Sequence, residues 1–375
     1  MTIPGKTITR RGALAVGTGA VIGGLGLSGT AQAAAGRRLE KLTPAQWAGQ
    51  RVIFSYPGTT PPASLLDQIS AGQAGGVIFF GENITSLSQI AAVIQQLKAA
   101  HDASPVRSPL LLMTDQEGGI VRRLPGQPVL SEKQVGASAD PAAAAAAAGT
   151  GAGQNLAGVG MNLNLAPVLD VYRQAGNFDD EFGRSYSMDP AVCAECGAAF
   201  VTAQQALGIA ATAKHFPGLG AATVDQNTDL GPVTLDVPLP DLRSIDERPF
   251  RTAITAGVQL VMTSWAVYLA LDPELPAGLS PAIVGGELRQ RLKFRGVTIT
   301  DALEAGAIAA FGTPAQCGVL AARAGMDVLL CSARDVTEGQ DTVTALAGAL
   351  QRRELDPGQF GIALRRVLAL RDSLA

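Results

Sequence analysis

Eight short apolar segments, spaced along most of the chain, are the feature that most limits what this sequence can fold into. Each is bounded by Gly, Pro or polar residues, and most are apolar at consecutive rather than alternate positions. Strands buried on both faces have this pattern, and they occur in parallel sheets covered by helices. The predicted strands are Val52–Tyr56, Val77–Phe80, Leu110–Thr114, Met161–Ala166, Ile209–Ala213, Leu260–Thr263, Val297–Thr300 and Asp327–Cys331.

Most gaps between these segments carry helical signals. Several begin with a polar residue followed by Pro, a good N-cap and first-turn pair, and others have apolar residues at helical spacing. This alternation predicts an α/β fold, a single-domain (β/α)8 TIM barrel over residues 36–375. An open doubly wound sheet would need a glycine fingerprint opening the first helix, and the sequence has none. The predicted helices begin at 61, 86, 140, 189, 280, 313, 336 and 357.

Residues 1–35 have the features of an export signal. Arg10-Arg11 precede an uncharged run from Gly12 to Gly29, and Ala31-Gln32-Ala33 has the small residues of a cleavage site. The paired arginines suggest the twin-arginine route. A membrane-spanning helix is the weaker interpretation, because the run is rich in Gly and no further apolar stretch reaches spanning length. We therefore expect a secreted, extracellular protein with no stable membrane insertion after removal of the signal.

Charge and rare residue types exclude several classes of function. A formal charge of -3 with interspersed signs gives no basic surface, so nucleic acid is not an expected partner. With only 2 histidines in the chain a His-rich metal site is excluded, and we expect neither metal nor cofactor. Cys193 and Cys196 form a CxxC without a second pair, which argues against a zinc or redox role. A disulfide between Cys317 and Cys331 stays open.

Polar side chains follow most of the predicted strands. In a barrel the site is built where strands end and the next loops begin. Lys214-His215 follow the fifth strand and precede a loop shaped by Pro217 and two glycines, and Asp301 follows the seventh. Each such residue taken alone has an ordinary structural interpretation, a satisfied histidine or a helix cap. Together, carboxylates facing Arg and Lys across a cleft are suited to binding vicinal sugar hydroxyls, and Phe182, Tyr186 and Trp265 to contacting a ring face.

These strand-end motifs resemble those of family 3 glycoside hydrolases, and their order and spacing are similar to the single-domain bacterial β-N-acetylglucosaminidases. The resemblance covers roughly Leu42 to Leu370. It implies a (β/α)8 barrel and retaining hydrolysis of terminal β-linked N-acetylglucosamine from chitin or peptidoglycan fragments. The motifs are Gly76-Val77-Ile78-Phe79-Phe80, Asp115-Gln116-Glu117-Gly118-Gly119, Gly183-Arg184-Ser185-Tyr186, Lys214-His215-Phe216-Pro217-Gly218 and Gly296-Val297-Thr298-Ile299-Thr300-Asp301.

The resemblance also implies roles for individual residues. Asp301 matches the family's catalytic nucleophile, and a carboxylate at a strand mouth can attack an anomeric carbon to form a glycosyl-enzyme. The alternative for Asp301 is a helix N-cap before Ala302–Ile308. The residues that match the family's sugar-hydroxyl contacts are Asp115, Arg123, Arg184, Lys214 and His215.

The chain departs from the family pattern where the proton donor is expected. In the single-domain members an Asp and a His, two residues apart, follow the Lys-His motif, and the His protonates the leaving group. Here Asp225 is kept, but Asn227 holds the His position. Asn cannot donate a proton at neutral pH, and general-acid help is typically worth about 10²–10⁴-fold. Asp225 itself is one candidate catalytic acid, and the carboxylates of residues 179–181 are others.

Further departures lie at Leu219 between the two glycines, at Ile120 in place of an Arg, at Trp265 in place of a third histidine and at Ala302 in place of a second Asp. The leading hypothesis is a secreted, monomeric β-N-acetylhexosaminidase-type glycosidase acting on a β-linked amino sugar. A catalytically weak or inactive sugar-binding homologue is an alternative from another class. β-Glucosidase or β-xylosidase specificity also stays open, because no acetamide pocket is identifiable from the sequence.

Overall fold

The computed structural model describes residues 41–374, and the export signal expected at residues 1–35 lies outside them. Eight parallel strands close into a barrel in the order β1-β2-β3-β6-β7-β9-β12-β13, with β13 pairing back to β1. All eight predicted strands are confirmed, with ends that shift by at most three residues. Their bounds are β1 Val52–Phe54, β2 Gly76–Ile78, β3 Leu111–Thr114, β6 Leu163–Asn164, β7 Ala210–Phe216, β9 Leu260–Thr263, β12 Val297–Ala302 and β13 Val328–Leu330.

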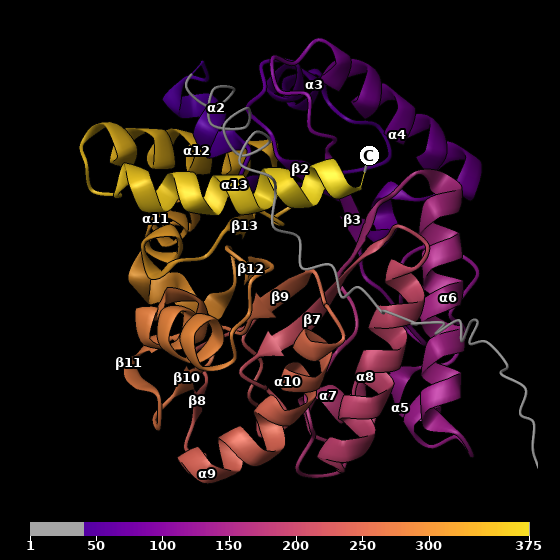
Figure 1. Ribbon diagram of the computed structural model, residues 1–375. Coiled ribbons are helices and arrows are strands. Elements are labelled where there is room, and N and C mark those ends of the chain that lie inside the picture. The colour runs from indigo at the N-terminus through magenta and orange to yellow at the C-terminus, as the bar shows by residue number, and fades with distance from the viewer. Residues whose placement is uncertain (1–40, 375) are drawn as a thin grey trace, which may run out of the picture. The chain divides into compact units, whose positions relative to one another are not determined.

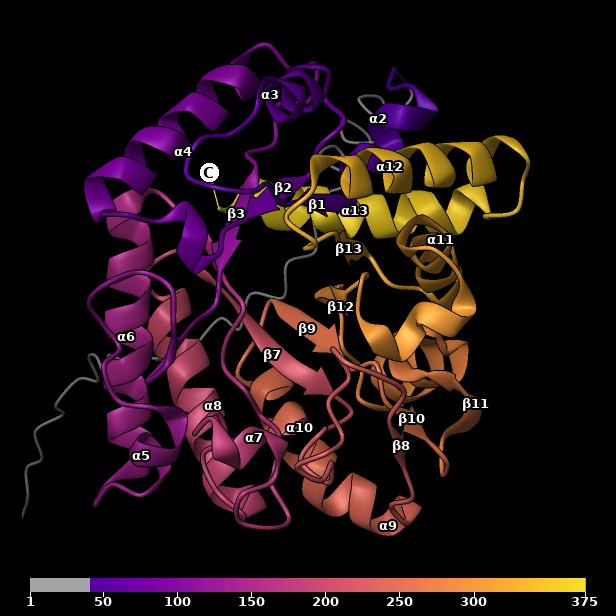
Figure 2. The ribbon, with the colours of Figure 1, turned by 180° about the vertical axis from the view of Figure 1, so that it is seen from behind.

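Helices surround these strands on the outside, as Figures 1 and 2 show from opposite sides. The predicted start signals operate as expected at three of them. Asp140 accepts the Ala143 amide at 3.0 Å, Asp189 accepts the Ala191 amide at 2.7 Å, and Thr313 forms a capping box with Gln316. The principal helices are α3 Ala63–Ser70, α4 Leu87–Asp102, α6 Pro141–Val159, α8 Pro190–Gln205, α10 Glu247–Thr255, η4 Ala282–Arg291, α11 Pro314–Ala324, α12 Val336–Gln351 and α13 Pro357–Ser373.

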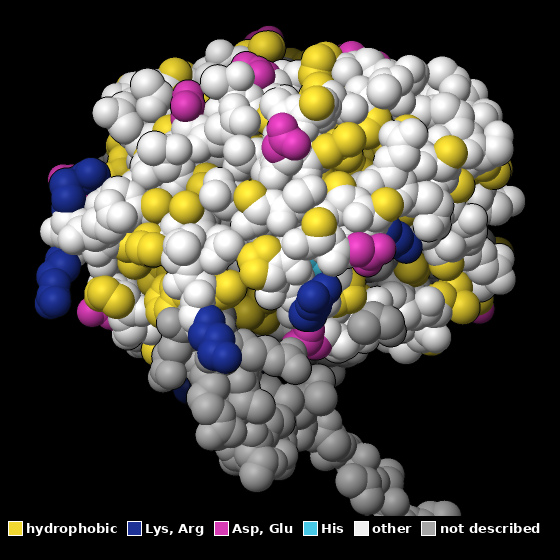
Figure 3. Space-filling view, turned by 90° about the horizontal axis from the view of Figure 1, so that it is seen from above, with side chains coloured by type: hydrophobic (Ala, Val, Ile, Leu, Met, Phe, Trp, Pro, Cys, Tyr) yellow, Lys and Arg dark blue, Asp and Glu magenta, His cyan; other side chains and the backbone are white. Residues whose placement is uncertain are grey.

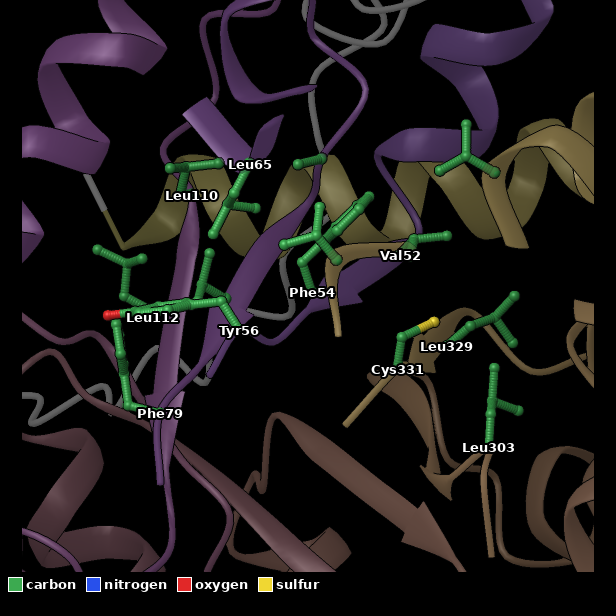
Figure 4. Packing of buried hydrophobic residues seen from close by; sticks show 14 of the residues in the cluster. Val52, Phe54, Tyr56, Leu65, Phe79, Leu110, Leu112, Leu303, Leu329 and Cys331 are labelled. Carbon is green, nitrogen blue, oxygen red and sulfur yellow. The ribbon is translucent and has the colours of Figure 1, made fainter. Parts of the chain in front are cut away.

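Side chains alternate between the barrel interior and the helix layer. On β1, Ile53 belongs to the interior cluster, whereas its neighbours Val52 and Phe54 pack outward. Phe54 is one of the outward residues drawn in Figure 4, together with Leu65 of α3 and Leu329 of β13. This alternation is the two-residue period of a strand, and both faces are apolar because both are buried. The interior residues from the strands include Ile53, Ile78, Leu111, Met113, Leu163, Ala210, Leu260, Met262, Val297, Ile299, Val328 and Leu330.

The segment between the fifth and sixth strands is more ordered than the sequence suggested. No helix was predicted there, but a π-helical turn at Leu242–Asp246 runs directly into α10. Phe250 and Ala253 of α10 are buried against the barrel, while Arg248 and Arg251 face solvent. The predicted helix 280–292 is a π-helix, η4. Small additional elements are α2 Pro44–Gly49, η1 Gly81–Asn83, β4 Gln116–Gly118, β5 Val121–Arg122, α5 Glu132–Gly136, α7 Phe178–Glu181, β8 Thr234–Leu235, α9 Leu239–Asp241, β10 Val267–Tyr268, β11 Asp272–Pro276, η3 Ala277–Leu279 and η5 Gly306–Phe311.

The four cysteines are buried and free, so the disulfide left open between Cys317 and Cys331 is not formed. Cys193 and Cys196 lie on α8 and pack in an apolar cluster with Phe200, which is a structural role. Within residues 41–374 no helix combines the length and the apolar character needed to cross a bilayer. Figure 3 shows one face of the molecule, on which Lys, Arg, Asp and Glu side chains are scattered among apolar and uncharged ones.

Candidate active site

A cavity of about 470 Å³ lies at the carboxyl ends of the barrel strands. Its apolar floor is the last inward layer of the barrel, which includes Ile78, Met262 and Leu330. This is the end at which (β/α)8 barrels place their sites, and the volume lies in the range of small-molecule pockets. The charged and polar residues of its wall are Asp115, Arg123, Arg184, Lys214, His215, Asn227, Thr228, Asp229, Asp301, Glu304, Ser332 and Arg334.

Strand periodicity explains how Lys214 and Asp301 meet. Ala210 points into the barrel from β7, so Lys214, four residues later, points the same way. Val297 and Ile299 point inward from β12, so Asp301, two residues after Ile299, also points inward. The two strands flank β9, which brings the Lys214-His215 pair and Asp301 to one cavity. Asp301 lies within β12 and not at the start of a helix, so the N-cap interpretation of this residue is wrong.

A compact ion network holds the basic side chains of the cavity. Lys214 Nζ lies 2.7 Å from Asp115 Oδ1 and 2.7 Å from Glu117 Oε1. Arg184 donates to both oxygens of Glu117 at 2.9 Å. Burial opposes ionisation of Glu117, but the charges of Arg184 and Lys214 and their hydrogen bonds outweigh it and lower its pKa to about 2. Glu117 therefore fixes two cations at the cavity wall without lining the cavity itself.

A second buried group orients His215. The Nδ1 atom of His215 lies 2.7 Å from Asp170 Oδ2, and Asp170 also accepts the backbone amides of His215 at 3.2 Å and Leu219 at 2.6 Å. Burial lowers the pKa of His215, but the adjacent Asp170 charge and hydrogen bond raise it above its ordinary value overall. The imidazole is thus held in the cavity wall, with its Nδ1 atom paired with Asp170.

Asp179 is fully buried beside this pair and has no hydrogen-bond partner among the described residues. Burial and the charge of Asp170 raise its pKa to about 7, although Arg184 and His215 oppose that rise. Asp170, Asp179 and His215 present ligand atoms within 4.8 Å of one another, which is close enough for a metal ion. Asp170 is already engaged as an acceptor and the cation Arg184 is near, so we interpret Asp170 as the hydrogen-bonded support of His215 rather than as a metal ligand.

The structure brings six of the seven predicted site residues to one cavity and leaves one outside it. Asp115, Arg123, Arg184, Lys214, His215 and Asp301 line the cavity. Asp225 is exposed and is not among the lining residues, and its proposed catalytic role stays a prediction.

The other candidate acids and ring contacts have mixed positions. Asp180 is buried in an ion pair with Lys133 at 2.5 Å, and Glu181 is exposed outside the cavity. Of the three aromatic residues expected to contact a ring, Phe182 lines the cavity, stacked edge-on against Phe178 at 6.0 Å. Tyr186 and Trp265 are instead core residues. Trp265 donates from Nε1 to the Ala302 carbonyl at 2.7 Å and thereby supports the end of β12.

Sequence reasoning missed Asp229, Glu304, Ser332 and Arg334, which reach the cavity from loops. The loop around Asn227 is attached to the segment that follows Asp301, because the Gly306 amide donates to Asp229 O at 2.9 Å and the Ala307 amide to Thr228 O at 3.0 Å. A signal for Asp229 was present: it follows Asn227 by two residues, the same spacing as the Asp and His of the family pattern.

Comparisons with known proteins agree on one family. The family model described as the glycosyl hydrolase family 3 N terminal domain matches residues 54–370. A protein of Arthroderma benhamiae named as an uncharacterized secreted glycosyl hydrolase is 48% identical over 330 residues, which span 88% of this chain and 93% of that protein.

Two solved structures are similar in fold and sequence. The β-N-acetylhexosaminidase of Beutenbergia cavernae has a TM-score of 0.81 and 36% identity, and the match covers 88% of this chain and 99% of that one. The family 3 β-N-acetylglucosaminidase of a Paenibacillus species has a TM-score of 0.82 and 32% identity over 89% of this chain, but this chain spans only 63% of it.

Proposed function

This chain belongs to glycosyl hydrolase family 3 and is a glycosidase acting on O-glycosyl bonds, and on that premise we propose that it releases terminal β-linked N-acetylglucosamine from chitin or cell-wall fragments with retention of configuration. The choice of N-acetylglucosamine as the sugar is based on the names of the similar proteins. One observation supports the chemistry above all: Asp301 faces the same cavity as the Lys214-His215 pair and the ion network behind it. A carboxylate at that position has both a sugar-binding wall and an open approach to a substrate.

The polar side chains of the cavity wall recognise the terminal sugar. Lys214 and Arg184 have more N–H donors than Glu117 accepts, and Asp115 has a second oxygen that Lys214 does not use, so all three can still hydrogen-bond sugar hydroxyls. Arg123, directly after β5, and His215, next to Lys214 on β7, complete the set. Because the network already fixes these groups, little side-chain entropy is lost when hydroxyls bind to them. The five residues then hold the ring so that its anomeric carbon meets Asp301.

In the proposed reaction an oxygen of Asp301 attacks the anomeric carbon and the bond to the aglycone breaks, which leaves a covalent glycosyl-enzyme. Water then attacks the same carbon and releases Asp301. Two inversions give net retention. Asp301 accepts the Ala302 amide through Oδ1 at 2.8 Å, so its second oxygen is the one available for attack.

Export supports the same assignment, because polymeric cell-wall and chitin substrates lie outside the cytoplasm. The Arthroderma relative carries the word secreted in its name, and residues 1–35 have a twin-arginine-type signal. Replacing Arg10-Arg11 by Lys-Lys is expected to retain the protein in the cell. Immunoblots of cell and medium fractions measure this, and equal amounts in the medium would contradict the route.

The activity test uses purified protein on nitrophenyl β-N-acetylglucosaminide and on chitobiose, with the β-glucoside and β-xyloside as competitors for specificity. We expect the acetylated substrates to be preferred and Asp301→Asn to lose on the order of 10³-fold or more in kcat. Asp236→Asn, an exposed carboxylate outside the cavity, is the matched control. A fluorinated sugar should add one glycosyl group to the peptide that contains Asp301. Calorimetric binding of chitobiose without turnover or adduct would show a sugar receptor instead.

A further inference from the structure

A retaining glycosidase needs a second carboxyl or an imidazole to protonate the leaving group. Asn227 lines the cavity at the position where the family pattern has its histidine, and its amide has no acidic proton. The donor must therefore be another side chain that reaches the cavity. The imidazole that lines it, His215, is assigned to the sugar hydroxyls and has its Nδ1 on Asp170. Besides Asp301, the carboxylates that line the cavity within the described residues are Asp115, Asp229 and Glu304.

Two of these three are engaged elsewhere. Asp115 accepts from Lys214 Nζ at 2.7 Å, and in the proposed function its other oxygen binds a sugar hydroxyl. Glu304 accepts from Ser332 Oγ through Oε1 at 2.7 Å and from the Ser332 backbone amide through Oε2 at 3.3 Å. Both oxygens of Glu304 are thus engaged as acceptors by Ser332.

Asp229 differs from both, because its carboxylate has no hydrogen bond or ion pair in the described part of the chain. Its backbone, in contrast, is fixed at both ends. The amide of Asp229 donates to Asn227 Oδ1 at 2.8 Å, and its carbonyl accepts from Gly306 at 2.9 Å. Asn227 therefore shapes the turn that presents Asp229, and Gly306 joins this turn to the segment after Asp301.

The electrostatic setting suits a proton donor. Asp229 is exposed to solvent on the loop. Desolvation where it meets the cavity wall nevertheless raises its pKa, and the nearby charge of Asp301 raises it further, against the opposing effects of His215 and Arg184. When Asp301 becomes a neutral ester in the glycosyl-enzyme, that second contribution disappears and the pKa of Asp229 falls. The same group then changes from an acid to a base between the two steps, as a retaining mechanism requires.

We propose that Asp229 is the general acid/base of this glycosidase, in place of the missing loop histidine. The inference rests on the proposed function. In the first step Asp301 bonds to the anomeric carbon, the carbon–oxygen bond to the aglycone breaks, and the Asp229 proton passes to the departing oxygen. In the second, Asp229 takes a proton from water, the water oxygen bonds to the anomeric carbon, and the bond to Asp301 breaks.

The test compares Asp229→Ala with the wild type and with Asp236→Ala as the matched control, on two leaving groups. Chitobiose needs protonation of its leaving oxygen, whereas dinitrophenyl β-N-acetylglucosaminide does not. We expect Asp229→Ala to lose about 10²–10⁴-fold in kcat/KM on chitobiose and under tenfold on the dinitrophenyl substrate. Retained activity on the second substrate also shows that the variant is folded. Azide, a nucleophile that needs no base, should restore turnover of the dinitrophenyl substrate and give the β-glycosyl azide.

The possible failures are distinguishable. If the wild type hydrolyses no β-glycoside and forms no adduct on Asp301, the proposed function fails and the acid assignment fails with it. If the wild type is active but Asp229→Ala keeps its chitobiose activity, or shows no azide rescue, only the Asp229 assignment is overturned. Asp225→Ala is the rival variant: a leaving-group-dependent loss and azide rescue in that protein would move the acid to Asp225.

Discussion

Glu117→Gln tests whether the ion network behind the cavity stabilises the fold as well as positioning the basic residues. Glu117 is 2% exposed and lies between Arg184 and Lys214. Its pKa falls from the ordinary value of 4.5 to about 2 in the folded protein. At about 1.4 kcal/mol per pKa unit, the ionised carboxylate contributes about 3 kcal/mol at pH 7. The amide of Gln keeps the shape but leaves buried Arg184 without its ion-pair partner and Lys214 with Asp115 alone.

The contribution has a definite pH dependence. A carboxyl whose pKa is depressed by folding stabilises the protein above its unfolded pKa of 4.5, and that stability is lost as the pH falls toward about 2. The gap between wild type and Glu117→Gln should therefore shrink from about 3 kcal/mol at pH 7 to roughly half at pH 3. Urea unfolding at both pH values measures it, and the exposed Glu274→Gln is the control. A gap that is absent at pH 7, or that widens on acidification, would refute the reasoning.

Three further predictions follow from other contacts. Gly306→Ala should lower chitobiose turnover more than tenfold with little loss on the dinitrophenyl substrate. The reason is that a Cβ at Gly306 would lie 2.5 Å from the Leu230 carbonyl oxygen and displace the Asp229 loop. Equal losses on both substrates would contradict this. Asp179→Asn should raise the melting temperature more at pH 8 than at pH 5. Folding raises the pKa of Asp179 from 3.8 to about 7, so folding becomes less favourable as the pH rises through that range. A larger increase in melting temperature at pH 5 than at pH 8 would contradict this. Reductant should leave the melting temperature unchanged, because all four cysteines are free and buried.

The barrel and one part of the site were predictable from sequence for the same physical reason. Strands buried on both faces are apolar throughout, and a two-residue period fixes which side chain at a strand end turns toward the axis. That is why Lys214 and Asp301 were found. The sequence motif contained Glu117 but did not reveal its role. That role is to pair with Arg184 and Lys214, which come from a loop and a strand distant in the sequence. α10 was missed because its buried face is short and interrupted by polar residues and Pro249.

The loop residues were missed for a different reason. No periodicity governs the stretch from Gly218 to Gly231, and its course is set by hydrogen bonds to residues 306 and 307, about 80 positions later in the chain. Matching Asn227 to the family histidine was reasonable from spacing alone. Only the folded loop shows that Asn227 accepts the Asp229 amide and that Asp229 lines the cavity while Asp225 does not.

With the roles proposed for Asp229 and Asp301, these two origins explain how the proton donor of such a barrel can change while its nucleophile is kept. Asp301 is placed by strand parity, so moving it would require a change of register in β12. The donor sits on a loop, where a shift of two residues requires only a new turn, and Asn227 supplies that turn. A carboxyl substituted for an imidazole would ordinarily be ionised at neutral pH, and thus a poor acid. At the cavity wall beside Asp301, however, desolvation raises the pKa of Asp229 and the charge of Asp301 raises it further, so in the proposed mechanism the nucleophile favours the protonated form of its partner until the glycosyl bond breaks.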